Sequence, residues 1–130
     1  MAVLSQVVDI IIPRTDTPGA KDAGVPENFD ALMRNWASAQ HGSQFSALVD
    51  EFGVAGLMGL APPERTELVR KIDAEKLALW DPVYARFKEL VLTLYYLSEA
   101  GATKELRYEL IPGKWEPWTE MTPDTRAWAV

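Results

Sequence analysis

Cysteine is absent from this sequence of 130 residues, which excludes a disulfide scaffold, thiolate zinc sites, cysteine-ligated iron–sulfur clusters and thiol nucleophiles. Histidine occurs once, at His41, so the chain cannot build a metal site or a proton relay from several histidines. Long hydrophobic runs are also missing. The apolar stretch 1–12 is interrupted by Gln6 and Asp9, and it is shorter than the roughly 20 residues that span a bilayer. These absences argue against most self-contained catalysts and against a membrane span in this chain.

Basic residues are outnumbered by acidic ones, 13 against 19, and the resulting net charge of −6 has the wrong sign for general nucleic-acid binding. Hydrophobic residues make up 48% of the chain and charged residues 25%, which is an ordinary balance for a globular protein. At roughly 100–200 residues per domain, the length predicts a single domain that covers residues 1–130.

Tryptophan is in excess, with five in the chain. Three of them, Trp115, Trp118 and Trp128, lie in the irregular C-terminal segment. Such a segment can fold back over the helices as core, or it can extend across another protein, because tryptophan is enriched among interface hot spots. The sequence leaves these two interpretations open.

Three segments repeat an apolar spacing of i, i+3, i+4, i+7, which marks one face of an amphipathic helix. The first begins at Leu4, the second runs from Phe29 to Trp36, and the third begins at Phe45. Prolines suited to a first helical turn predict two more helices, beginning near residues 62 and 82. We therefore expect an all-α fold, a compact bundle of about five helices with an irregular Trp- and Pro-rich C-terminal tail.

The longest predicted helix follows the N-cap Asp81 and ends at about residue 99. Its stretch 90–97 is apolar nearly all round, so we expect it to be the central helix. Gly42 is expected to end the second helix and Ser43 to cap the third. The expected organisation is an N-terminal helix (1–12), a motif loop (13–25), a helical core (26–99) and a short turn with an extended tail (100–130), in which only 122–128 looks helical.

Two features could indicate chemistry but have simpler interpretations. The glycine-rich stretch 53–59, GVAGLMG, lacks the spacing and the lysine of a phosphate-binding loop, which favours a helix end. His41 has no orienting carboxylate close in sequence, as a catalytic base would need, and is better explained as a helix C-terminal or solvated residue. A stand-alone small helical enzyme with a carboxylate-based site is the alternative that these residues leave open.

The segment 13–24, PRTDTPGAKDAG, is rich in turn-forming residues. It is longer than the 2–8 residues that connections between helices usually need. Arg14 and Asp16 give it paired polar side chains. A plain helix connector is the simpler interpretation, but the composition is also typical of a rigid recognition loop.

Two stretches resemble a known family. The segment IIPRTDTPGAKDAGVPENFD resembles the N-terminal signature of the gluconate 2-dehydrogenase subunit 3 family, and LYYLSEAGATKELRYELIPGKW resembles its C-terminal signature. Both occur in the family's order and at about its separation, so the resemblance covers nearly the whole chain.

The resemblance implies a small helical accessory subunit without catalytic, cofactor-binding or metal-binding residues of its own. Its partner would be a large FAD-dependent dehydrogenase of the glucose–methanol–choline type, which holds the flavin, in a heterodimer or higher hetero-oligomer. A cytochrome c that accepts the electrons is a further candidate partner. Family members typically carry a twin-arginine leader, and none precedes the first helix here. We expect a periplasmic location if a leader has been removed, and a cytoplasmic one otherwise.

The resemblance and the tryptophan excess together nominate residues that would contact the partner. Those from the two signatures are Arg14, Thr15, Asp16, Thr17, Pro18, Tyr95, Tyr96, Glu99, Arg107, Tyr108 and Trp115, and those from the tail are Trp118 and Trp128.

Overall fold

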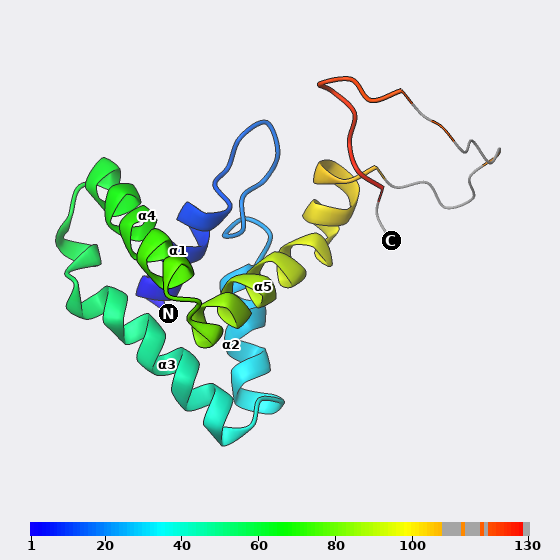
Figure 1. The fold of residues 1–130 in the computed structure, drawn as a ribbon. Coiled ribbons are helices and arrows are strands. Elements are labelled where there is room, and N and C mark those ends of the chain that lie inside the picture. Colours follow the sequence, from blue (N-terminus) through cyan, green and yellow to red (C-terminus); the bar gives the residue numbers. More distant parts are fainter. Residues whose placement is uncertain (108–112, 114–117, 119, 129–130) are drawn as a thin grey trace.

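The computed structural model describes residues 1–107, 113, 118 and 120–128. Over these residues the protein is all-α and has no strand, only an isolated bridge between Arg107 and Trp128, which confirms the predicted class. No described helix is long and apolar enough to cross a membrane. The elements, drawn in Figure 1, are α1 (Ala2–Ile11), α2 (Val25–Asn35), α3 (Ala39–Val54), the 3-10 turn η1 (Leu57–Gly59), α4 (Pro62–Ala78), α5 (Pro82–Tyr96) and the short π-helix η2 (Gly101–Glu105).

The core lies where α5 meets α2 and α3, and α4 and η2 also pack on α5. Three rings fill its centre: Phe29 meets Phe45 and Phe87 edge-on, with ring centroids 5.7 and 5.4 Å apart. Edge-on pairs are favourable because the positive ring edge faces the negative ring face. These contacts place the fifth helix at the centre of the bundle. It ends at Tyr96, not near residue 99, and it is shorter than α3 and α4, so the prediction that it is the longest helix was wrong.

The buried side of α5 is formed by Tyr84, Phe87, Val91 and Tyr95, which recur every three to four residues. The sequence pattern missed Tyr84, whose hydroxyl donates to Asp73 at 2.8 Å. Burial raises the pKa of this hydroxyl, and the carboxylate adds to the effect. A buried phenol needs such a partner, and an acceptor from α4 is not visible in the spacing along α5.

The predicted break between the second and third helices was wrong. The α2 helix ends at Asn35, and Ser38 caps α3 by accepting a hydrogen bond from the His41 backbone N–H at 3.2 Å. His41 therefore lies in the first turn of a helix, not at a C-terminal end. Gly42 is accommodated inside α3, and Trp36, expected in the core, is 85% exposed at the end of α2.

The glycine-rich stretch after α3 has the helix-end role that we expected. Gly56 has a φ of +81°, which reverses the chain, and Leu57 inserts into the core. The Arg65 guanidinium then ties this turn to its surroundings, donating to the Leu60 carbonyl at 2.8 Å and to the Gln6 side chain at 2.9 Å.

The helix predicted for 122–128 is replaced by a single turn. The Thr122 N–H donates to the Thr125 hydroxyl at 2.8 Å, and the Thr125 N–H donates to the Thr122 carbonyl at 3.0 Å. These bonds close one turn without a helical continuation, so Pro123 begins a bend only. Predicted contact residues Tyr108 and Trp115 lie outside the described residues.

Candidate partner interface

The loop between α1 and α2 is closed by its own hydrogen bonds. The Ala20 N–H donates to the Ile12 carbonyl at 2.9 Å, so the two ends of the loop meet. The Arg14 guanidinium contacts the Asp22 carboxylate at 2.7 Å, and this hydrogen-bonded partner lowers the pKa of Asp22. A Cβ atom at Gly19 would lie 2.7 Å from the backbone nitrogen of Arg14, so only glycine fits at this position. The loop therefore has a rigid shape.

The structure brings the two signature segments together (Figure 1). The Tyr95 hydroxyl of α5 donates to the Pro18 carbonyl of the loop at 2.7 Å, and the Thr17 hydroxyl donates to Glu105 of η2 at 2.5 Å. Tyr95 is buried, which raises the pKa of its hydroxyl. We call this contact region, formed by Thr17, Pro18, Tyr95 and Glu105, the signature joint.

Gly101 lets η2 fold back onto the end of α5. A Cβ atom there would lie 2.0 Å from the Tyr95 carbonyl oxygen, a distance that real Cβ atoms do not show. The Gly101 N–H donates to the Ser98 hydroxyl at 3.0 Å, and that hydroxyl donates to the same Tyr95 carbonyl at 2.6 Å. The glycine thus determines where η2, and with it Glu105, meets the loop.

The predicted contact residues divide into two groups. Thr17 and Tyr95 are buried within the chain, where they hold the signature joint and offer no surface to a partner, and Pro18 is half-buried. The Arg107 guanidinium lies 4.1 Å from the Trp128 ring centroid, a cation–π contact within the chain. The described candidates that remain exposed are Arg14, Thr15, Asp16, Tyr96, Glu99, Arg107, Trp118 and Trp128.

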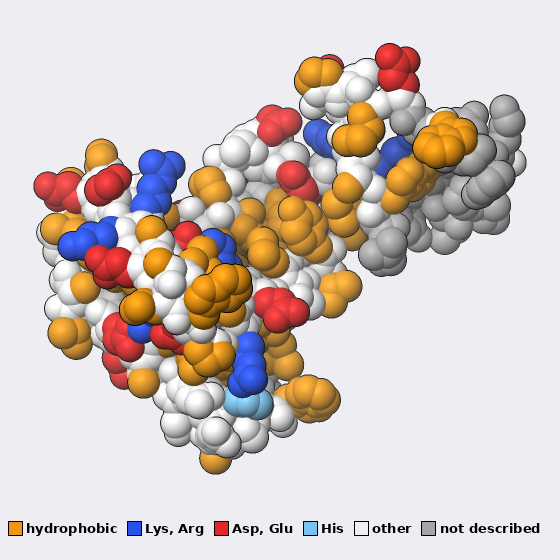
Figure 2. Space-filling view, viewed as in Figure 1, with side chains coloured by type: hydrophobic (Ala, Val, Ile, Leu, Met, Phe, Trp, Pro, Cys, Tyr) orange, Lys and Arg blue, Asp and Glu red, His pale blue; other side chains and the backbone are white. Residues whose placement is uncertain are grey.

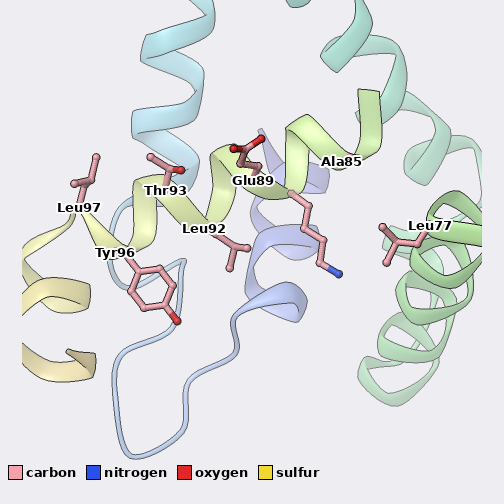
Figure 3. A pocket seen from close by; sticks show the side chains of 8 residues that line it. Leu77, Ala85, Glu89, Leu92, Thr93, Tyr96 and Leu97 are labelled. Carbon is pink, nitrogen blue, oxygen red and sulfur yellow. The ribbon is translucent and has the colours of Figure 1, made fainter. Parts of the chain in front are cut away.

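A larger apolar surface lies beside the joint, along the outer side of α5. The segment 90–98 contains no charged residue, yet Leu92, Tyr96 and Leu97 are exposed. Together with Leu77 of α4 they line an open groove between the end of α4 and α5. Figure 3 shows Leu77 on the α4 side, Leu92 and Tyr96 pointing to one side of α5, and Glu89, Thr93 and Leu97 pointing to the other.

The corner between α4 and α5 continues this surface. After Leu77, the chain exposes Leu79 and Trp80 before α5 begins. Figure 2 shows hydrophobic side chains gathered over this corner and along α5. We call Leu77, Leu79, Trp80, Leu92, Tyr96 and Leu97 the α5 surface.

Ion pairs and a cap hold the corner in place. The Lys76 ammonium lies 2.7 Å from Glu51 of α3 and 3.2 Å from Asp81, and these carboxylates, Glu51 foremost, raise the pKa of Lys76. Asp81 accepts the backbone N–H groups of Val83 and Tyr84 at 2.9 and 3.1 Å and so caps α5. The Tyr84 N–H is the main reason that the pKa of Asp81 is lowered.

Sequence reasoning found one member of the α5 surface, Tyr96, and missed the others. It treated Leu97 as core because apolar residues surround it, whereas the side chain is 75% exposed. The signal for these residues was the absence of charge from the segment 90–98, because a helix that is apolar all round is normally buried on every side. Trp80 also had a signal, since a large aromatic residue stands between a helix end and the Asp-Pro start of the next.

The described residues form an apolar groove but no cluster of metal-ligating side chains. Within the described part of the chain, no group of three or more histidine, cysteine, aspartate or glutamate side chains could hold a metal ion. The groove beside α5 is open and lined mainly by apolar side chains, as are surfaces that bind other proteins.

The described residues define a small all-α protein with an exposed apolar surface along α5. The family model of gluconate 2-dehydrogenase subunit 3 matches residues 1–113, so the chain belongs to this family, whose members are accessory subunits of dehydrogenase complexes. The match confirms the resemblance drawn from the two signatures. No curated protein and no solved structure matches the chain. The matched range includes the signature joint and the α5 surface, and it ends before the tail that carries Trp118 and Trp128.

Proposed function

We propose that this chain is the non-catalytic small subunit of a large FAD-dependent dehydrogenase that oxidises a sugar, a polyol or a glycoside. It binds the large subunit and stabilises it. The family match over residues 1–113 carries this proposal, because it ties the chain to dehydrogenase complexes. The flavin and the residues that react with the substrate belong to the large subunit, and a cytochrome c is a candidate acceptor of the electrons.

The location of the complex follows from the small subunit. Where a twin-arginine leader has been removed from this chain, the complex is periplasmic and the small subunit has escorted the flavoprotein there. Otherwise the complex works in the cytoplasm.

Expression of the large subunit with and without this chain tests the proposal. The neighbouring reading frames are first searched for a large glucose–methanol–choline-type flavoprotein, which then serves as the probe. We expect soluble yield, FAD content and dehydrogenase activity with an artificial electron acceptor to be higher when both chains are present. A large subunit that is soluble, FAD-loaded and fully active alone would contradict a stabilising role. Substrate turnover by the isolated small chain would instead support the stand-alone enzyme.

A further inference from the structure

Trp80 is unusual both in its backbone conformation and in the exposure of its side chain. It is the one non-glycine residue with a positive φ among the described residues, at 53°, and its side chain is 89% exposed. A bulky residue in the left-handed region is strained, because its Cβ crowds the neighbouring backbone. The position follows the last turn of α4, where the Asp81 N–H donates to the Lys76 carbonyl at 3.0 Å. Glycine is the usual residue at this point of a helix end.

Tryptophan at this position does not stabilise the isolated chain. Glycine would relieve the backbone strain, and the exposed indole buries too little apolar area to offset that strain. Backbone outliers of this kind tend to persist where the residue serves a function. A large aromatic side chain held out from a rigid corner has the properties of an interface anchor, because it brings a large contact area at a small cost in rotamer entropy.

The α5 surface is close in area to one side of a specific protein–protein interface. With roughly 200 Å² for each fully exposed large side chain, the exposed fractions of its six members correspond to about 700 Å². A stable interface buries about 800 Å² on each partner, whereas the largest apolar patch of a typical monomer covers about 300–600 Å². The surface thus approaches the area that a permanent partner requires.

We infer that the α5 surface is where this subunit binds the dehydrogenase subunit, with Trp80 as the anchor. The inference rests on the proposed function, which supplies the partner. Two observations favour this occupant: the area matches one side of a specific interface, and the surface lies wholly within the range that the family model matches. The two described tryptophans of the tail lie outside that range.

The test compares three variants of the 130-residue chain, each assayed with the flavoprotein that serves as the probe above. Trp80→Gly removes the anchor and relieves the strain. Leu97→Gln makes the far end of the α5 surface polar without touching the corner. Trp36→Ala is the matched control, because it removes an equally exposed tryptophan from a different corner, at the end of α2. The Kd for the flavoprotein and the melting temperature of each isolated small subunit are measured.

We expect Trp80→Gly to weaken binding at least tenfold, as loss of a hot-spot residue does, while its melting temperature stays equal or rises. Loss of a residue with a purely structural role would lower both the affinity and the melting temperature. A lower affinity with an equal or higher melting temperature therefore identifies an interface anchor. Leu97→Gln should also weaken binding, and Trp36→Ala should bind like the wild type.

Three other outcomes overturn the inference in different ways. Wild-type binding by both Trp80→Gly and Leu97→Gln would place the interface elsewhere and leave the proposed function standing. A wild-type chain that does not bind the flavoprotein would remove the proposed function as well. A self-association of the isolated chain that Trp80→Gly abolishes, with flavoprotein binding unaffected, would assign the surface to a second copy of this chain.

Discussion

The signature joint makes a quantitative prediction at Tyr95, whose hydroxyl donates to the Pro18 carbonyl at 2.7 Å. Tyr95→Phe removes this bond and keeps the shape of the ring. The carbonyl loses its partner in a half-buried position, which should cost about 1–2 kcal/mol of unfolding free energy. For a domain of this length, 1 kcal/mol lowers the melting temperature by roughly 4 °C, so we expect a decrease of about 4–8 °C.

The pH dependence gives the same prediction a second readout. Burial raises the pKa of the Tyr95 hydroxyl in the folded state, so the neutral form favours folding. This contribution is present below the usual tyrosine pKa of about 10 and is lost as the pH rises through the folded-state value. Above pH 10 the wild type should therefore lose stability faster than Tyr95→Phe. The comparison cancels the similar contribution of Tyr84, which both proteins share.

Urea denaturation followed by circular dichroism measures both effects, with the linear extrapolation applied at several pH values. Tyr96→Phe is the control, because water reaches this half-exposed neighbour and can replace a lost hydrogen bond. Its stability should match that of the wild type. If Tyr95→Phe is as stable as the wild type at pH 7 and follows the same curve above pH 10, then the joint does not hold the loop to α5.

Three further predictions concern packing and helix capping within the fold. Gly101→Ala should lower the unfolding free energy by more than about 2 kcal/mol, seen in a thermal melt, because its Cβ would strike the Tyr95 carbonyl; an unchanged melt would mean that η2 shifts freely. Leu57→Ala should cost about 2–5 kcal/mol in urea denaturation, because the side chain is fully buried, and a loss below about 1 kcal/mol would show that the turn is not part of the core. Asp81→Ala should cost about 1 kcal/mol through the lost cap. Since the folded-state pKa of Asp81 is lowered, its contribution is present above its usual value of 3.8 and is lost as the pH falls, so the variant should lose less stability than the wild type between pH 5 and 2.

Two residues of the family signatures have a structural role that the sequence did not predict. We expected Thr17 and Tyr95 to contact the partner, and the structure buries both in a joint within the chain. Residues that identify the family here shape the subunit itself, at least at these two positions. We propose that exposed neighbours such as Tyr96, which continue onto the α5 surface, make the contact with another chain instead.

Helix capping shows how far local patterns reach. The pattern placed Asp81 correctly as an N-cap, because an Asp-Pro pair allows few alternatives. It failed at Gly42, where a glycine resembled a helix end, because the competing N-cap at Ser38 starts α3 earlier and places Gly42 inside the helix. Ser38 and Gly42 both carry strong local signals for a helix boundary. The boundary forms at Ser38, where α2 and α3 can pack together.

The sequence by itself determined the helical class, the N-cap at Asp81 and the family, because periodicity, capping residues and motifs depend on neighbouring residues. Only the tertiary structure decided which apolar residues are covered. Leu97 and Trp80 are as hydrophobic as any core residue, and their exposure depends on where α4 and α5 meet. It also brought Pro18 and Tyr95 into contact across 77 residues of chain, since a hydrogen bond between distant segments depends on the whole fold and leaves no local pattern.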